Sequence, residues 1–210
     1  MNTGLFQFIR SIINDRDNPI NDIGKYIFDL DEVDILHEIN VCERRVWVGS
    51  CPTAVSTHGA CFGVTIPMEM AEGTISAIIL TDAFYDRMDK DGKNFIYMHE
   101  IGHIVNGDID KAVELSKQYA AATESATELQ QVLNMRKLML SNRAIDEEFA
   151  ADEYAANNIG YSQAINGLSQ LLIAPRWAIS KDSKKEIRRR IAHLELRRDQ
   201  LRKEASYHVA

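Results

Sequence analysis

The segment "YMHEIGHIVNGD", residues 97–108, constrains this chain more than any other stretch. It places His99 and His103 four residues apart, and in an α-helix residues at that spacing lie on one face, one turn above the other. The residues around the two histidines are mostly apolar, which predicts that the helix is largely buried. Buried polar side chains need hydrogen-bond partners or a bound ion. The segment therefore predicts a buried helix with two imidazoles directed at one common partner.

We interpret that partner as a zinc ion, because imidazole nitrogens bind zinc at about 2 Å. Glu100 follows the first histidine and leans toward the same side, where it can take a proton from a water on the ion. Zinc lowers the pKa of such a water from about 15.7 to about 7, so a carboxylate can complete the transfer near neutral pH. Gly102, between the ligands, leaves room for a facing backbone. The competing interpretation, a surface helix with two incidental histidines, is disfavoured by the apolar surroundings.

A hydrolytic zinc site usually has three protein ligands and a water. The segment "AIDEEFAADEYAANNIG", residues 144–160, predicts a helix whose apolar side includes Glu148 and Asp152, one turn apart. Buried carboxylates are costly unless they meet a cation or strong donors. We therefore predict Glu148 as the third ligand and Asp152 as the acceptor that orients one ligand histidine through its distal N–H. A solvated acidic face, with Asp146 and Glu147 shifting the register, is the alternative.

The remaining patterns predict one α+β domain over residues 1–210. The chain has 45% hydrophobic residues, enough for a single core. We expect a helical N-terminal segment over 1–40, with helices at 3–14 and 22–30. The further elements expected are strands near 40–48, 61–67 and 75–80, with Pro67 ending the second. We also expect a helix over 95–106 with Asn94 as N-cap and Asn106-Gly107 as its stop, and helices over 143–158, 162–172 and 183–205.

Residues 110–140 contain no proline or glycine, and their apolar positions step by three and four from Leu115 to Leu133. This spacing is typical of a coiled-coil seam. It predicts a helical arm over 110–142 that packs either as a hairpin within the chain or against a second subunit, which would make the protein a homo-oligomer.

Composition limits the classes of partner. The formal net charge is −7, which disfavours a nucleic-acid binder, although residues 184–203 are locally basic. No apolar stretch approaches the roughly 20 residues of a membrane span, and the N-terminus lacks the pattern of a secretory signal. We therefore expect a cytoplasmic protein.

The three cysteines form an odd set, which predicts no disulfide framework and fits a reducing compartment. Cys51, His58 and Cys61 have two interpretations: a second metal cluster, or small residues of the apolar core. Their spacing fits no familiar metal site, which favours the second interpretation.

The motif "HEIGHIVNGD" followed by "EFAADEYAANNIG" resembles the zinc metallopeptidases typified by the bacterial heat-shock protease HtpX and the CAAX prenyl protease. Their signature is HExxH with a downstream ExxxD, matched here by Glu148 and Asp152. The resemblance covers roughly residues 74–196 and includes a terminal arginine, here Arg190, but the proline-containing motif before that arginine is missing. Residues 1–70 match nothing in that family. The chain also resembles the small regulatory peptidases of the ImmA/IrrE type, which carry HExGH and a later glutamate ligand.

These resemblances imply a zincin-like core with a small β-sheet, an active-site helix and a helical insertion. They imply a soluble zinc endopeptidase that hydrolyses an intracellular protein or peptide, with Glu100 passing the proton of the water to the leaving amine. The strand 75–80 either lines the cleft and pairs with an extended peptide or is an ordinary core strand. The candidates for stabilising the oxyanion are Tyr154, Tyr161, Arg190 and His193.

Two further functions stay open. One is a regulatory peptidase of a mobile element or stress response, and the other is a non-catalytic, zinc-stabilised interaction module. Glu100 separates the last from an enzyme, because a purely structural zinc site has no use for a base beside its ligand. A latent protease, whose 110–142 arm covers the cleft, is a variant of the leading interpretation.

Overall fold

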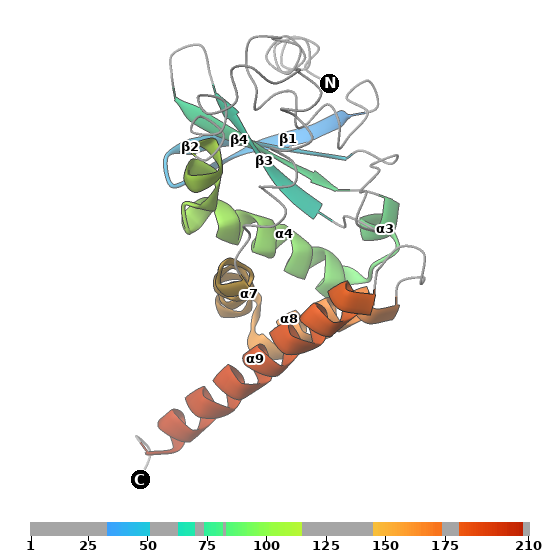
Figure 1. Cartoon of the computed structure of the whole chain (residues 1–210), viewed down its shortest axis with the longest axis vertical. Helices are drawn as coiled ribbons and strands as arrows, with labels where there is room; N and C mark the ends of the chain where they lie inside the picture. The colour runs from blue at the N-terminus through green and yellow to red at the C-terminus, as the bar shows by residue number, and fades with distance from the viewer. Residues whose placement is uncertain are drawn as a thin grey trace, which may run out of the picture.

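The structure, a computed structural model, describes residues 33–50, 63–69, 74–81, 83–114, 145–173 and 181–207. Within these residues the fold is α+β, as predicted, with one four-stranded mixed sheet and five α-helices. Figure 1 shows the sheet at one end, α4 beneath it, and α7, α8 and α9 on the far side of α4. The elements are β1 Asp34–Val41, β2 Arg44–Ser50, β3 Gly63–Glu69, β4 Ile75–Thr81, α3 Ala83–Asp86, α4 Lys90–Val105, α7 Ile145–Ile159, α8 Tyr161–Gln170, the 3-10 helix η2 Leu171–Ile173 and α9 Lys181–Tyr207.

The strand order in the sheet is β1-β2-β4-β3. β1 and β2 are antiparallel, β2 and β4 run parallel, and β3 returns antiparallel to β4. β4 therefore lies inside the sheet with both edges paired, and its residues Ser76 to Thr81 are all buried. Of the two interpretations of the strand 75–80, the ordinary core strand is confirmed and the edge that pairs with a peptide is wrong. Of the strands in the described part of the chain, β3 and β1 hold the edge positions.

The N-terminal part of the described chain is a β-hairpin. β1 occupies the end of the range 1–40 that was predicted to be helical, so the helical prediction is wrong there. The single strand predicted over 40–48 is also wrong, because the turn between β1 and β2 falls within that range. Cys42 and Glu43 form this turn with φ values of 50° and 63°, the left-handed pair that a tight two-residue hairpin turn requires. Asn-Gly and Asp-Gly are the usual residues in such a turn, so the pair Cys-Glu did not allow the turn to be predicted from the sequence. The helices expected at 3–14 and 22–30 lie outside the described residues, as do Cys51, His58 and Cys61.

The helix α4 begins five residues earlier than predicted. Its N-cap is Asp89, whose side chain accepts a hydrogen bond from the backbone N–H of Gly92 at 2.9 Å. Asn94 lies inside the helix and is not the cap. The run Asp-Gly-Lys-Asn, residues 91–94, suggests a loop in the sequence, but it belongs to the start of the helix. The end agrees with prediction: Asn106 is the C-cap and Gly107 has a φ of 74°.

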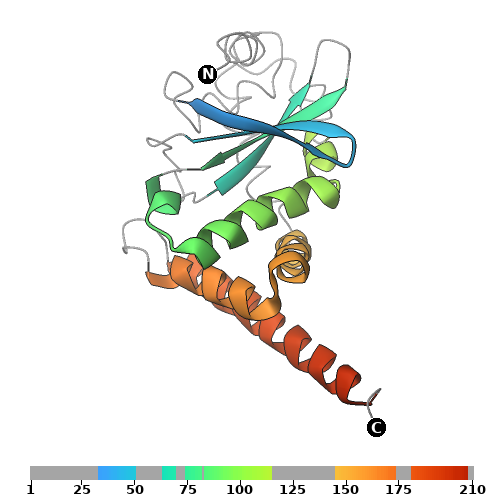
Figure 2. The same ribbon diagram turned by 180° about the vertical axis from the view of Figure 1, so that it is seen from behind.

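α4 is buried on two sides, as Figures 1 and 2 show. Toward the sheet, Ile101 and Ile104 pack with residues of β2 and β4. Away from the sheet, Phe95 packs in a second cluster with residues of α7, α8 and α9, among them Ala155, Leu168 and Leu194. This two-sided burial is what the apolar residues around the histidines predict.

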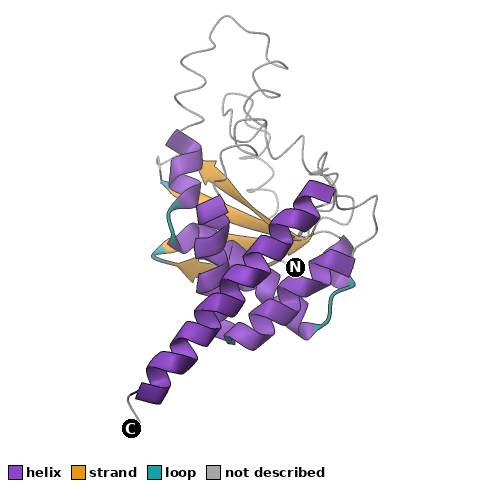
Figure 3. Ribbon diagram, turned by 60° about the horizontal axis from the view of Figure 1, so that its bottom comes forward, coloured by secondary structure: helices purple, strands orange, loops and turns teal. Residues whose placement is uncertain are grey.

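The C-terminal helices lie close to their expected positions. α7 ends before Gly160, which has a φ of 92°, and α9 runs diagonally across the helical layer in Figure 3. Residues 108–114 are helical, whereas the rest of the arm expected over 110–142, with its apolar seam, lies outside the described residues. No helix in the described ranges combines the length and the apolar character needed to cross a membrane.

The closest backbone approach between α4 and α7 occurs at Gly102. A Cβ there would lie 2.9 Å from Cα and 3.0 Å from the carbonyl oxygen of Ala151, which confirms the predicted facing backbone. We expect Gly102→Ala to lower the free energy of unfolding by about 1–3 kcal/mol, because overpacking outweighs alanine's higher helix propensity. Urea denaturation measures this. Lys90→Ala, at an exposed position of the same helix, should change it by less than about 0.5 kcal/mol, and equal stability of both variants would contradict the close approach.

Candidate metal centre

Three buried side chains from two helices converge below the sheet. His99 and His103 come from successive turns of α4, and Glu148 comes from the first turn of α7. Their exposed fractions are 4%, 1% and 7%, and each offers one ligand atom within 4.8 Å of the other two. The structure thus brings together the three residues that the sequence analysis selected as ligands.

The spacing of these ligand atoms matches a small four-coordinate ion. The two Nε2 atoms of His99 and His103 are 3.2 Å apart. Glu148 places Oε2 at 3.4 Å from Nε2 of His99 and Oε1 at 3.6 Å from Nε2 of His103. Ligands bound about 2.05 Å from a tetrahedral ion stand roughly 3.3 Å apart. The group can therefore hold a metal ion with little rearrangement.

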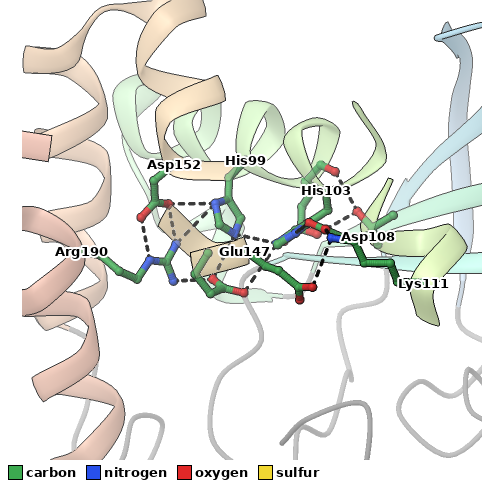
Figure 4. A network of polar contacts seen from close by, with 10 residues as sticks. His99, His103, Asp108, Lys111, Glu147, Asp152 and Arg190 are labelled. Atoms are coloured by element: carbon green, nitrogen blue, oxygen red, sulfur yellow. Dashed lines mark hydrogen bonds and ion pairs between the residues drawn. The ribbon is translucent and has the colours of Figure 1, made fainter. Parts of the chain in front are cut away.

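Each histidine has a carboxylate behind it. Nδ1 of His99 lies 2.9 Å from Oδ1 of Asp152, and Nδ1 of His103 lies 2.9 Å from Oδ2 of Asp108 (Figure 4). A neutral imidazole that donates its Nδ1–H in this way presents a lone pair at Nε2. Two lone pairs and the carboxylate of Glu148 then face one another, an arrangement that can hold a cation.

Asp152 stands where the sequence analysis placed it, whereas Asp108 was missed. Asp108 lies five residues after His103 and beyond the end of α4, so helical periodicity does not connect the two. Gly107, with its positive φ, reverses the chain between them. The only indication in the sequence is the residue type, because Asp108 is a carboxylate that comes shortly after a candidate ligand histidine.

Arg190 of α9 forms the outer wall of the site. Its Nε and Nη2 lie 2.7 Å and 2.6 Å from the two carboxylate oxygens of Asp152, and its Nη1 lies 2.8 Å from Oε2 of Glu148. Arg190 is 8% exposed, and its guanidinium binds both the carboxylate of the candidate ligand Glu148 and the carboxylate of Asp152 behind His99 (Figure 4). Its contacts fit the support of ligands better than the stabilisation of an oxyanion.

Two other candidates for the oxyanion have partners away from the ligand group. Nε2 of His193 lies 2.9 Å from Oε1 of Glu153, and the imidazole stacks on Phe149. The hydroxyl of Tyr161 donates to Asn157 at 3.3 Å. Tyr154 packs its ring beside the cluster of α4 and the sheet.

Glu100, the predicted base, is buried beside His99 with an exposed fraction of 3%. Its Oε2 accepts a hydrogen bond of 2.8 Å from the hydroxyl of Thr65, a residue of β3 that the sequence analysis did not select. Thr65 lies 35 positions away in the chain, so no local pattern could reveal the contact.

The charges around the site hold a proton on His99 when no metal ion is bound. Burial lowers the pKa of His99, but its hydrogen bonds to Asp152 and Glu148 outweigh burial and raise the pKa to about 9. Burial also raises the pKa of Asp152, yet the positive charge of Arg190 prevails and holds that pKa below its ordinary value. At neutral pH a proton on His99 therefore supplies positive charge between the carboxylates of Asp152 and Glu148.

Metal affinity should follow the protonation of His99. A metal ion needs the neutral imidazole, so at a pH below the raised pKa of His99, about 9, binding must displace a proton. We expect the affinity to fall about tenfold for each pH unit below that pKa and to level off above it. Chelator competition between pH 6.5 and 8.5 measures the slope, and calorimetry in buffers of different ionisation enthalpy counts the released proton. An affinity that is constant over this range would contradict the prediction.

Asp108 is itself held by Lys111. The Lys111 Nζ donates to Oδ1 of Asp108 at 2.8 Å and to Oε1 of Glu147 at 3.4 Å (Figure 4). Burial raises the pKa of Asp108, but the hydrogen bonds from His103 and Lys111 outweigh it and lower that pKa. The carboxylate behind His103 is therefore ionised and tied to the first turn of α7.

We expect Asp108→Ala to weaken metal binding about 10- to 100-fold, because His103 loses the acceptor that fixes its ring and tautomer. Asp110→Ala is the matched control, since Asp110 pairs with Arg44 on the surface at 2.9 Å. Titration of each variant with zinc or cobalt measures the difference. Equal affinities of the two variants would show that the contact with His103 does not support binding.

Comparisons of the chain with models of protein families, with curated proteins and with solved structures found no match. The class is therefore defined by fold and site alone: an α+β protein whose buried His-His-Glu group can hold a metal ion, with a carboxylate behind each histidine.

Proposed function

We propose that this protein is a zinc-dependent endopeptidase with His99, His103 and Glu148 as ligands and Glu100 as the general base. The observation that carries the proposal is the spacing of the ligand atoms, 3.2, 3.4 and 3.6 Å, with a buried glutamate directly after His99 in the same helix. A helix with both histidines under a small mixed sheet supports a zincin-like core. The residue patterns support the same class through their resemblance to the HtpX and ImmA/IrrE types of peptidase.

The donor set supports zinc as the metal. Two imidazole nitrogens and one carboxylate oxygen suit zinc, whereas magnesium and calcium prefer oxygen ligands throughout. Structural zinc sites usually have four protein ligands, and catalytic sites have three and an open position. The described residues supply three, which favours the catalytic kind.

The residues of the chain divide the chemistry among them. When bound, zinc would lower the pKa of a water and polarise the scissile carbonyl. Glu100 accepts a proton from the attacking water and delivers it to the nitrogen of the leaving amine as the C–N bond breaks. Asp152 and Asp108 keep both imidazoles oriented. Arg190 offsets the charge of Glu148 and Asp152.

An extended peptide is the substrate that the sheet supports. β3 lies at the edge of the sheet next to β4, and its residue Thr65 contacts Glu100. A peptide paired with β3 would place its backbone near the base, in the manner of strand addition. The edge assigned to substrate is therefore that of β3 and not that of the interior strand β4.

A zinc-stabilised interaction module is the second candidate. Arg190 joins α9 to α7, and the ligands join α7 to α4, so a bound ion would also tie three helices together. Glu100 separates the two functions, because its removal should leave a structural site unaffected.

We expect Glu100→Gln to keep its zinc and to lose cleavage of casein or a fluorogenic peptide by a factor of about 10² to 10⁴. The amide has the size of the carboxylate but cannot take the proton. Elemental analysis measures zinc, and steady-state kinetics measures cleavage. Glu153→Gln is the control, since Glu153 pairs with His193 outside the ligand group, and should cleave as the wild type does. Equal cleavage by Glu100→Gln and the wild type would rule out this role.

A further inference from the structure

The contact between β3 and α4 is polar at one point. The Thr65 hydroxyl lies 2.8 Å from Oε2 of Glu100 and 3.1 Å from the carbonyl oxygen of the same residue. Thr65 and Glu100 are only 5% and 3% exposed. A hydroxyl has a single hydrogen to donate, and the carboxylate oxygen is both nearer and charged. The hydrogen therefore goes to Oε2, in a charge-assisted bond.

Gly63 shapes the same contact two residues earlier on the same face of β3. A Cβ at Gly63 would lie 2.6 Å from Cγ2 of Ile96, 3.2 Å from Cγ of Glu100 and 3.3 Å from its Oε1. The missing side chain lets the strand approach Glu100 closely, so β3 as well as α4 limits where its carboxylate can lie.

A buried threonine in a strand commonly satisfies its hydroxyl on a backbone carbonyl. Thr81 of β4 does so in this sheet, with its hydroxyl 3.4 Å from the carbonyl oxygen of Gly49 and an exposed fraction of 6%. Thr65 also has a backbone carbonyl within 3.1 Å, but the carboxylate oxygen of the proposed base is nearer, at 2.8 Å. Thr81, which bonds a backbone carbonyl, therefore serves as the matched control.

We propose that Thr65 is the positioning residue of Glu100, an inference that rests on the proposed peptidase function. Its hydroxyl holds Oε2 and directs Oε1 to the attacking water. One O–H bond of the water breaks as its proton moves to Oε1, and the same proton later leaves for the amine nitrogen. Thr65 keeps its own hydrogen throughout. Because β3 is also the strand proposed to pair with the peptide, one strand places both the substrate and the base.

The test compares three variants of the full, zinc-loaded chain: Thr65→Val, Thr65→Ser and Thr81→Val. Valine has the shape of threonine without the hydroxyl, and serine keeps the hydroxyl. For a fluorogenic peptide that the wild type cleaves, we expect Thr65→Val to lower kcat roughly 10- to 100-fold, the effect of a hydrogen bond to a charged group, with zinc content and KM unchanged. Thr65→Ser should restore most of kcat, and Thr81→Val should retain it.

A second measurement does not depend on turnover. Acetohydroxamate chelates a metal ion and gives its hydroxyl proton to a neighbouring base. Its affinity for the cobalt-substituted protein therefore depends on whether the carboxylate of Glu100 is held in position to accept that proton. Visible absorption follows the binding, and we expect Thr65→Val to bind it more weakly than the wild type and Thr81→Val.

The outcomes separate the two proposals. Wild-type kcat in Thr65→Val, no recovery in Thr65→Ser, or equal losses in Thr65→Val and Thr81→Val would each overturn the role of Thr65. A metal-loaded wild type that cleaves no peptide would overturn the peptidase, and acetohydroxamate binding alone would then decide whether Thr65 positions Glu100. A chain that binds no metal would overturn both.

Discussion

The structure depends on two carboxylates that are buried side by side on α7. Asp152 is 0% exposed and Glu148 is 7% exposed, and a buried charge costs several kcal/mol unless partners surround it. Those partners come from other helices: Arg190 from α9 on one side, and the imidazoles of α4 on the other. The arrangement of the three helices that satisfies the carboxylates is therefore also the one that forms the site.

The charges of this site favour a cation. In the described part of the chain the buried ionisable side chains are His99, Glu100, His103, Glu148, Asp152 and Arg190. Around His99, the carboxylates of Glu148 and Asp152 outnumber the guanidinium of Arg190 by one, so one negative charge remains when the imidazole is neutral. A proton on His99 offsets that charge, and a bound cation would do the same. The raised pKa of His99 and the capacity to hold a metal ion thus have the same cause, carboxylates enclosed by apolar packing.

Features within one helix could be predicted from the sequence, and contacts between distant segments could not. Helical spacing alone placed His99 and His103 on one face, and Glu148 with Asp152 on another. Thr65 and Asp108 were missed because the strand pairing that brings β3 over α4 and the turn at Gly107 leave no period in the sequence. The identity of the metal, the reaction and the peptidase family stay predictions, since the fold and the ligand geometry alone do not choose among them.

The strand order explains why the edge strand carries the polar contact. β2 and β4 lie inside the sheet and hold α4 through apolar packing of Ile101 and Ile104, so a hydroxyl there would have to find a backbone partner. The edge strand β3 contacts α4 at Glu100. Thr65 of β3 gives that buried carboxylate a hydrogen-bond donor, which an apolar residue at the same position could not supply. Interior strands thus pack against the helix through apolar residues, and the edge strand supplies a hydrogen-bond donor to Glu100.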